Sequence, residues 1–332
     1  PDLKWEKSTE FNIGLDWSLL SDRLSGTIDV YHKKTTGMLW NYDVPCPPNL
    51  YPTTLANVGE MRNEGIEIAV NGVPVKTRDF QWKTTVTLSH NANKLLSLSN
   101  SLYQTANQHD VAYLGEPISI STQRLEVGKP LGQWYGMKVT GVSDNGLWMV
   151  QNKTTGKSEE FTDNMLTDDT YHQYLGNAIP KLNLGWSNTL SYKGFDLTMQ
   201  FTGQLGYKIL NEARAFYQNN AEVYNRLKSA AQPVYGHVLS VAQKQTFCSY
   251  FLENGDYMKL SNATLGYTVP LKVNKYVKNI YVYVSGENLF TITGYKGLDP
   301  ELSDSDPQSS GIDWRDKYPS IRSFTFGAQF TF

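Results

Sequence analysis

The chain has 332 residues and a formal net charge of −2, from 30 Lys and Arg against 32 Asp and Glu. This near balance argues against a nucleic-acid-binding protein, which needs a basic surface to neutralise phosphates. No apolar run approaches the roughly 18 residues of a membrane-spanning helix, so such a helix is excluded. A transmembrane β-barrel stays possible, because its alternating strands average to a polar composition.

Period-two alternation of apolar and polar residues dominates the chain and predicts β-strands. The first segment places apolar side chains at every odd position from Phe11 to Leu19. The alternation changes phase once, at Ser261 and Asn262, which predicts a β-bulge there. In chain order, the pattern predicts eleven strands, of which the fifth and sixth are the least regular: 6–19, 24–36, 58–73, 79–94, 118–126, 132–141, 181–192, 195–207, 255–269, 276–292 and 323–332.

The connections between these strands alternate strictly between short and long. The short ones are 20–23, 74–78, 127–131, 193–194 and 270–275. The long ones are 37–57, 95–117, 142–180, 208–254 and 293–320. An outer-membrane barrel has this organisation, with short periplasmic turns at one end and long extracellular loops at the other.

We therefore expect an all-β fold, an antiparallel up-and-down transmembrane β-barrel with long extracellular loops. Eleven antiparallel strands cannot close on themselves, because the first and the last run in the same direction. An open sheet in lipid would leave two rows of backbone groups unpaired. Residues 1–332 are thus predicted to be the C-terminal part of one barrel domain, about eleven strands of a roughly 22-stranded barrel.

Aromatic side chains are frequent in the predicted long loops, where binding residues are often placed. Exposed rings suit sugar or peptide ligands and equally suit the interface with a covering protein. The alternative is that the loops pack on themselves. The candidates for contact with a ligand or a covering protein are Trp40, Tyr42, Tyr113, Trp148, Tyr217 and Trp314.

The polar faces of the strands should line the barrel lumen, with Asp196, Gln200 and Gln204 as the clearest candidates. The apolar face of the last strand ends in Phe330 and Phe332. These rings would lie at the periplasmic edge of the membrane, where aromatic side chains are favoured.

The sequence contains no catalytic constellation and no metal-binding motif, so it predicts neither an enzyme nor a cofactor. The acidic residues Asp304, Asp306 and Asp313 do not have the spacing of a calcium loop, and a solvated loop is favoured over a calcium site. The adjacent acids Asp168 and Asp169 receive the same interpretation.

Two further features leave alternatives open. Residues 209–231 have helical character, and an external helix there could pack on the loops or dock a partner. Cys46 and Cys248 fall in different outer loops, and the sequence does not decide whether they pair.

Several stretches resemble SusC/RagA-type TonB-dependent outer-membrane transporters of Bacteroidetes. They are Asn57–Glu67 (NVGEMRNEGIE), Tyr174–Trp186 (YLGNAIPKLNLGW), Met258–Pro270 (MKLSNATLGYTVP) and Val282–Gly297 (VYVSGENLFTITGYKG), together with the phenylalanine-rich C-terminal strand. They are spread over nearly the whole chain.

The resemblance implies a nutrient importer that carries oligosaccharides or peptides across the outer membrane. It implies a SusD-like surface lipoprotein as a partner, and energy delivered by the TonB complex through an N-terminal part, with a plug, that this sequence does not contain. The remaining half of the barrel would be another partner, and Phe330 and Phe332 would belong to a signal read during assembly. A passive porin is the first alternative, and a soluble β-rich glycan-binding protein is a more distant one. The substrate stays open between glycan and peptide.

Overall fold

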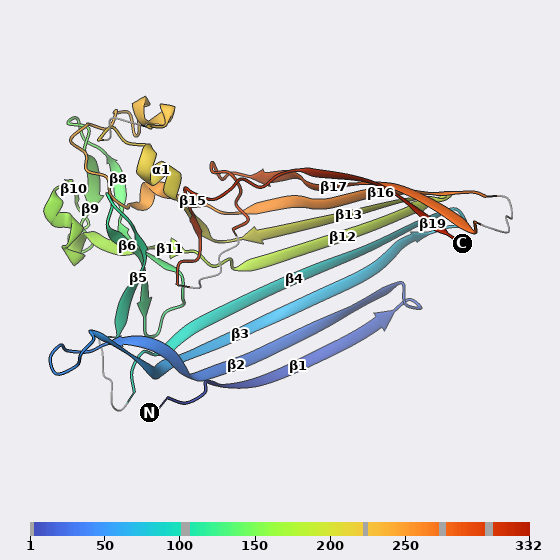
Figure 1. The fold of residues 1–332 in the computed structure, drawn as a ribbon, viewed down its shortest axis with the longest axis horizontal. Coiled ribbons are helices and arrows are strands. Elements are labelled where there is room, and N and C mark those ends of the chain that lie inside the picture. The colour runs from blue at the N-terminus through green and yellow to red at the C-terminus, as the bar shows by residue number, and fades with distance from the viewer. Residues whose placement is uncertain (1–2, 101–106, 222–224, 272–276, 303–307) are drawn as a thin grey trace.

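The computed structural model describes residues 3–100, 107–221, 225–271, 277–302 and 308–332. They form one long, open antiparallel sheet with a second, compact body at one end of it (Figure 1). We call that body the loop domain; it comprises the described parts of residues 98–181, 206–256 and 294–322.

The long sheet contains nine strands, and each strand is antiparallel to its neighbours. Five of the eight contacts between neighbours join strands that follow each other directly in the chain, and the other three, β4–β12, β13–β16 and β17–β19, each span one part of the loop domain. In sheet order the strands are β1 (Lys7–Leu19), β2 (Leu24–Asp43), β3 (Thr53–Lys76), β4 (Phe80–Ser97), β12 (Leu182–Tyr192), β13 (Phe195–Leu205), β16 (Tyr257–Val269), β17 (Asn279–Thr293) and β19 (Ser323–Thr331).

The prediction of eleven barrel strands is wrong by two. Residues 118–126 and 132–141 do form strands, β6 (Ile120–Glu126), β7 (Gln133–Met137) and β8 (Val139–Val142), but these lie in the loop domain. Their alternation is weak because most of their residues are buried, whereas a barrel strand has one exposed apolar face. Nine is also odd, so β1 and β19 run in the same direction, and each has a single partner in the described sheet.

Short and long connections still alternate, and each kind gathers at its own end of the sheet (Figure 1). The predicted loop 37–57 is shorter than expected, because β2 and β3 continue as a paired hairpin and leave only residues 44–52 between them. The predicted bulge is confirmed, since the register between β16 and β17 shifts between Leu260 and Asn262. The predicted antiparallel barrel wall is confirmed, and the described sheet forms only part of a barrel because it stays open between β1 and β19.

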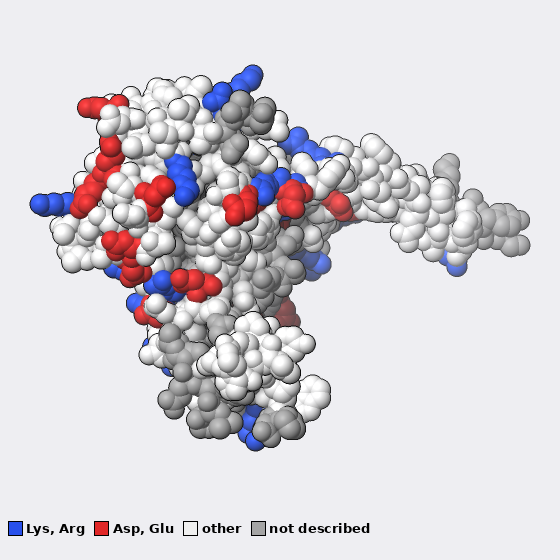
Figure 2. Space-filling view, turned by 60° about the vertical axis from the view of Figure 1, so that its left-hand side comes forward, with Lys and Arg blue, Asp and Glu red and all other residues white. Residues whose placement is uncertain are grey.

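One face of the sheet is apolar and exposed along its whole width. Phe11 is 65% exposed, and Phe326, on the opposite edge, is 79% exposed. Exposed apolar surface of this extent is typical of a lipid-facing barrel wall. Figure 2 shows charged side chains gathered on the loop domain, whereas the arm of strands projecting from it carries few.

The other face of the sheet is polar and is the inward face of a barrel. Asp196 accepts a hydrogen bond from the Tyr281 hydroxyl at 2.7 Å, and Gln204 donates to Asn183 at 3.2 Å. The Tyr281 ring lies over Gly266, where an added Cβ would overlap with the ring. Asp196, Gln200 and Gln204 alternate with the outward residues of β13, as expected for lumen-facing positions.

The loop domain is built from three small sheets around a shared apolar core. The sheets have the orders β11–β7–β6–β5, β10–β9–β8 and β15–β14–β18. Their remaining strands are β5 (Gln108–Leu114), β9 (Trp148–Gln151), β10 (Ser158–Glu160), β11 (His172–Asn177), β14 (Lys208–Asn211), β15 (Leu252–Asn254) and β18 (Ile312–Asp313). Because Trp134, Phe247 and Ile312 come from three different loops and are almost fully buried together, the loops fold as one unit.

Helices are few and short. Within the described residues, the predicted helix 209–231 is reduced to α1 (Glu212–Tyr217) and the 3-10 turn η3 (Lys228–Ala231), and its first residues belong to β14 instead. Residues 222–224 of that range lie outside the described residues. Three more 3-10 turns are η1 (Asp163–Leu166), η2 (Asp169–Tyr171) and η4 (Ser249–Phe251). None of the helices in the described chain has the length and hydropathy needed to cross a membrane.

The two cysteines do not pair. Cys46 is exposed in the loop between β2 and β3, and Cys248 is buried in the core of the loop domain. Burial raises the pKa of the Cys248 thiol to about 12, so this side chain behaves as a small apolar core residue.

A buried ion pair fastens the loop 294–302 to the sheet. The Lys259 ammonium, on the inward face of β16, lies 2.7 Å from a carboxylate oxygen of Asp299 and 2.7 Å from one of Glu301. The Lys259 side chain is 3% exposed and that of Asp299 is 9% exposed. Although burial alone would raise the pKa of Asp299, the hydrogen bonds from Lys259 and Ser320 lower it, so the carboxylate stays ionised.

The C-terminal phenylalanines lie on the outward face of β19, with Phe330 53% and Phe332 76% exposed. Deleting Phe332 removes one ring from an edge that keeps Phe324, Phe326 and Phe330, at a cost of about 1.5–3 kcal/mol. We expect a low yield in the outer membrane but near-normal heat resistance of the assembled molecules. Surface abundance and the melting temperature of the purified variant together check this. Normal abundance would leave Phe332 as a lipid-facing residue without a role in assembly.

Candidate functional site

A cavity of about 560 Å³ opens on the loop domain between β5, β6, β7 and the turns η1 and η2. Its walls mix apolar and aromatic side chains with hydrogen-bonding groups, a composition typical of ligand sites. The lining residues are Gln108, Asp110, Tyr113, Ser119, Ile120, Ser121, Gln123, Arg124, Tyr135, Gly136, Met137, Leu166, Thr167, Asp169, His172 and Phe247.

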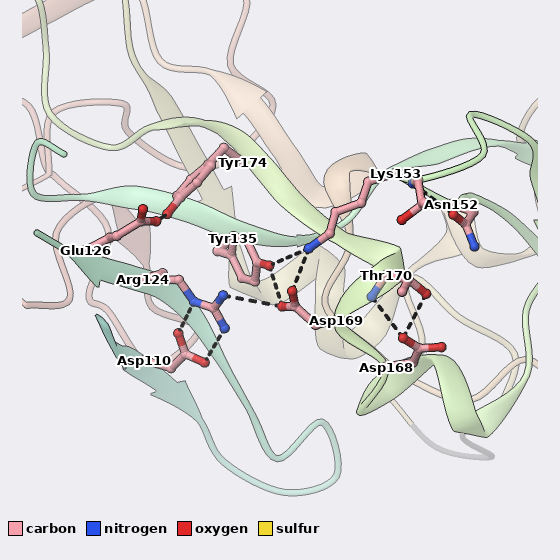
Figure 3. A network of polar contacts seen from close by, with 11 residues as sticks. Asp110, Arg124, Glu126, Tyr135, Asn152, Lys153, Asp168, Asp169, Thr170 and Tyr174 are labelled. Atoms are coloured by element: carbon pink, nitrogen blue, oxygen red, sulfur yellow. Dashed lines mark hydrogen bonds and ion pairs between the residues drawn. The ribbon is translucent and has the colours of Figure 1, made fainter. Parts of the chain in front are cut away.

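The base of this cavity is an ionic network centred on Arg124 (Figure 3). The Arg124 guanidinium donates two hydrogen bonds to Asp110, at 2.6 and 3.0 Å, and one to Asp169 at 3.3 Å. It also stacks on the Tyr135 ring, 3.7 Å from the ring centroid. Asp169 further accepts hydrogen bonds from the Tyr135 hydroxyl at 2.5 Å and from Lys153 at 2.6 Å.

Local structure explains why these groups meet. Arg124 and Asp110 face each other across the β5–β6 hairpin, where they are direct register partners. The Asp168 side chain accepts a hydrogen bond from the Thr170 N–H at 2.9 Å and so caps η2. This cap presents the adjacent Asp169 toward the strands.

The network is electrically balanced, with two cations, Arg124 and Lys153, against two carboxylates, Asp110 and Asp169. Burial would raise the pKa of Asp169, but its hydrogen bonds from Lys153 and Tyr135 hold that pKa at about 2. Burial lowers the pKa of the nearby His172. The Asp169 carboxylate therefore stays ionised across the physiological pH range.

The arrangement is suited to binding a polar ligand. Tyr113 keeps 59% of its surface exposed at the cavity wall, and the carboxylates of Asp110 and Asp169 are about half exposed. Two lining atoms, Ser119 Oγ and Gln123 Oε1, are buried without a hydrogen-bond partner in the described chain. Aromatic faces beside hydrogen-bonding groups are features that sugars and peptides can both use.

The six aromatic residues predicted as contacts differ in their exposure and packing. Tyr113 is the one on the cavity wall. Trp148 is 2% exposed and Tyr42 is 7% exposed, so both rings are packing residues of their clusters. The remaining three, Trp40, Tyr217 and Trp314, are half-buried and pack against the apolar clusters. A ligand-contact role for these residues stays a prediction.

Sequence reasoning missed Arg124, Tyr135 and Asp110, and treated Asp169 as a solvated loop residue. None of them lies in a recognisable motif. The one local signal is the pairing of Asp110 with Arg124 across a hairpin, which could be found only after the 118–126 strand had been paired correctly.

Of the three acidic residues considered as a calcium site, the structure describes one. Asp304 and Asp306 lie outside the described residues. The third acid, Asp313, accepts a hydrogen bond from the Tyr295 hydroxyl at 2.6 Å, and burial raises its pKa. Within the described ranges, no cluster of three or more His, Cys, Asp or Glu side chains is placed to hold a metal ion.

Comparison with known proteins gives one family. Residues 1–289 match the family described as "TonB dependent receptor-like, beta-barrel". The match covers seven of the nine strands of the long sheet in full, most of β17, and most of the loop domain.

Curated relatives match along the whole chain. It is 29% identical to TonB-dependent receptor P3 and 30% identical to TonB-dependent receptor P26, both of Formosa agariphila, over 34% and 35% of their lengths. It is 27% identical to TonB-dependent receptor SusC of Bacteroides thetaiotaomicron, over 32% of that protein. The chain thus spans about a third of the length of the relatives it matches.

Solved structures show the same fold. The structure of the RagAB peptide transporter superimposes with a TM-score of 0.80 at 22% identity, covering all of this chain and 36% of that one. The RagAB peptide importer in its open-open state gives a TM-score of 0.81 at 23% identity, over 35% of that chain.

Proposed function

The chain belongs to the TonB-dependent receptor family through its β-barrel domain, and on this premise we propose that it is part of an outer-membrane importer that takes up oligosaccharides or peptides. The resemblance to SusC/RagA-type transporters is confirmed by the relatives, and the barrel lies in the outer membrane. This is a family of transporters rather than enzymes.

The observation that carries the proposal is the family match combined with a folded loop domain at one end of the sheet. A barrel wall needs only short loops to span a membrane, yet this chain builds a domain with its own core at the end that carries the long connections. A structured domain with an open, polar cavity can select a ligand before it enters the barrel. Selection of this kind distinguishes an importer from an unselective pore.

The substrate class follows from the chemistry of the cavity. Because Arg124 and Lys153 are balanced by Asp110 and Asp169, the site does not favour a strongly charged ligand. Tyr113 offers an exposed ring for stacking against a sugar ring or an apolar peptide side chain. An uncharged oligosaccharide or a peptide of mixed charge fits these features.

The partners are proposed from the family. We infer that a SusD-like lipoprotein covers the loop domain, that the rest of the barrel pairs with β1 and β19, and that TonB supplies energy through a part of the protein outside this chain. Purification of the full-length protein from its native membrane, followed by identification of co-purified lipoproteins, tests the first of these.

The test of function measures uptake by cells that carry the full-length gene. Labelled oligosaccharide and peptide pools are supplied, and uptake is compared between Tyr113→Ala and the unaltered protein. Losing one stacking ring should cost about 1–3 kcal/mol of ligand binding, which is roughly a 5-fold to 150-fold loss of uptake at low ligand concentration. Tyr113→Phe should keep most of the uptake, because the stacking face remains.

Tyr318→Ala is the matched control, because Tyr318 is an exposed loop tyrosine, 82% exposed, outside the cavity. Equal uptake by Tyr113→Ala and Tyr318→Ala would contradict a ligand role for the cavity. Collapsing the proton gradient should abolish uptake. Uptake that survives this treatment would instead identify a passive pore.

A further inference from the structure

A row of cations crosses the outward face of β2, β3 and β4, next to the exposed apolar surface of that face, which we call the lipid-facing belt. Lys34 on β2 is the direct register partner of Arg62 on β3, and Arg62 is the direct partner of Lys94 on β4. Partners in an antiparallel sheet have Cβ atoms about 5 Å apart on the same face. Three cations therefore stand side by side on neighbouring strands.

The position of this row relative to the membrane is set by the strand pattern. The next row on the same face lies two residues, about 7 Å, closer to the membrane centre. It contains Phe11, His32 and Glu64. The next row, another two residues on, is apolar at Ile13 and Val30. The cations thus lie at the extracellular edge of the lipid-facing belt.

The positive charge of this row is only partly neutralised. Lys34 pairs with Glu60 at 3.0 Å, and Arg62 pairs with Glu64 at 3.3 Å. Lys94 is exposed and forms no ion pair in the part of the chain that the structure describes. Like charges placed directly opposite each other destabilise a sheet, so this row does not serve the stability of the fold.

A groove lies immediately below the cations on the same outward face. Its volume is about 420 Å³, and it runs over the side chains of Phe11, Val30, Ile66, His90 and Ala92. The His90 ring is held by a hydrogen bond of 2.5 Å to the Lys181 carbonyl oxygen. A mostly apolar groove beneath a row of cations is complementary to a lipid, whose acyl chain would fill the groove and whose phosphate would contact the cations.

We propose that this face binds a phosphorylated lipid of the outer leaflet, with an acyl chain in the groove and the phosphate on Lys94, Arg62 and Lys34. The groove favours a lipid over free phosphate, because free phosphate has no apolar part to bury there. The cations favour an anionic lipid over a neutral one. This lipid site is separate from the ligand cavity of the loop domain.

The test uses the full-length protein, purified in detergent and supplied with lipid A as the probe. Native mass spectrometry measures the fraction of protein that retains lipid A. Each cation near a lipid surface contributes about a fivefold factor in affinity, so Lys94→Gln should weaken retention about fivefold and Lys34→Gln with Lys94→Gln about 25-fold. Lys94 has no ion pair to lose in the described chain, and the Lys34–Glu60 pair is exposed and worth little, so both variants should keep a melting temperature close to that of the unaltered protein.

Lys33→Gln is the matched control, because Lys33 is adjacent to Lys34 but on the inward face. It should leave retention unchanged. Ala92→Phe, which fills the groove and keeps every cation, should reduce retention of lipid A several-fold.

Three results would overturn the proposal. Lys33→Gln could weaken retention as much as Lys94→Gln, or dephosphorylated lipid A could be retained as well as the phosphorylated form. Inorganic phosphate could also displace lipid A at an equal concentration, which would identify a site for free phosphate. Each measurement is made on purified protein, so it does not depend on uptake.

Discussion

Replacing Lys259 by methionine should lower the free energy of unfolding by about 3–5 kcal/mol, because it leaves the buried carboxylate of Asp299 without its cation. Methionine fills similar space, so lost packing contributes little. The heat-dependent shift in gel migration of the full-length protein gives the midpoint of unfolding. The loop 294–302 should also become sensitive to protease, since Asp299 and Glu301 fasten it to β16.

Two further variants separate charge from packing. Lys259→Met combined with Asp299→Asn removes both buried charges and should recover most of the loss. Lys296→Met changes an exposed lysine of the same loop and should have an effect within about 0.5 kcal/mol. If Lys259→Met and Lys296→Met unfold at the same temperature, the buried pair does not hold this loop.

Arginine at Leu197, which faces the lipid on β13, should impair insertion of the barrel by up to about 2–4 kcal/mol, the cost of an arginine at the membrane midplane. Leu197 faces outward on β13, where it is the register partner of Leu190 and Leu265. Two rows along the strand on the same face is the Trp186–Phe201 stack, with ring centroids 5.0 Å apart. An arginine there must either lose its hydration or thin the bilayer around it.

The matched change is Gln200→Arg on the same strand. Gln200 is exposed on the inward face, so its arginine would remain in water. The fraction of heat-resistant protein in the outer membrane measures both variants. Equal impairment at the two positions would contradict the assignment of the outward and inward faces.

Much of the barrel wall could be predicted from the sequence, because a strand's two faces alternate with a period of two residues. Phe11 to Leu19 and Phe324 to Phe332 each show that alternation, and the structure places both sets outward. The bulge near Ser261 was predictable for the same reason, since one extra residue reverses the phase. These features depend only on neighbours along one strand.

Which sheet a strand joins could not be predicted in this way. Residues 118–141 alternate weakly because the loop domain buries them, and burial on both faces removes the signal. The contact that excludes them from the wall is the pairing of β4 with β12, for example Val86 with Trp186. That pairing joins segments separated by residues 98–181, the first part of the loop domain.

The functional surfaces depend on the same long-range contacts. Asp169 reaches Arg124 only because η2 packs beside the β5–β6 hairpin, and Trp148 is a core residue only because loops from elsewhere in the chain cover it. Lys34, Arg62 and Lys94 are far apart in sequence and form one row through the register of three strands. The sequence by itself determined the strands, their two faces and the family, because each can be recognised from residues that are close together in the sequence. The tertiary structure alone decided the strand count, the cavity and the cationic row. Each of these depends on contacts between segments that are distant in sequence, and no local pattern specifies which segments pair.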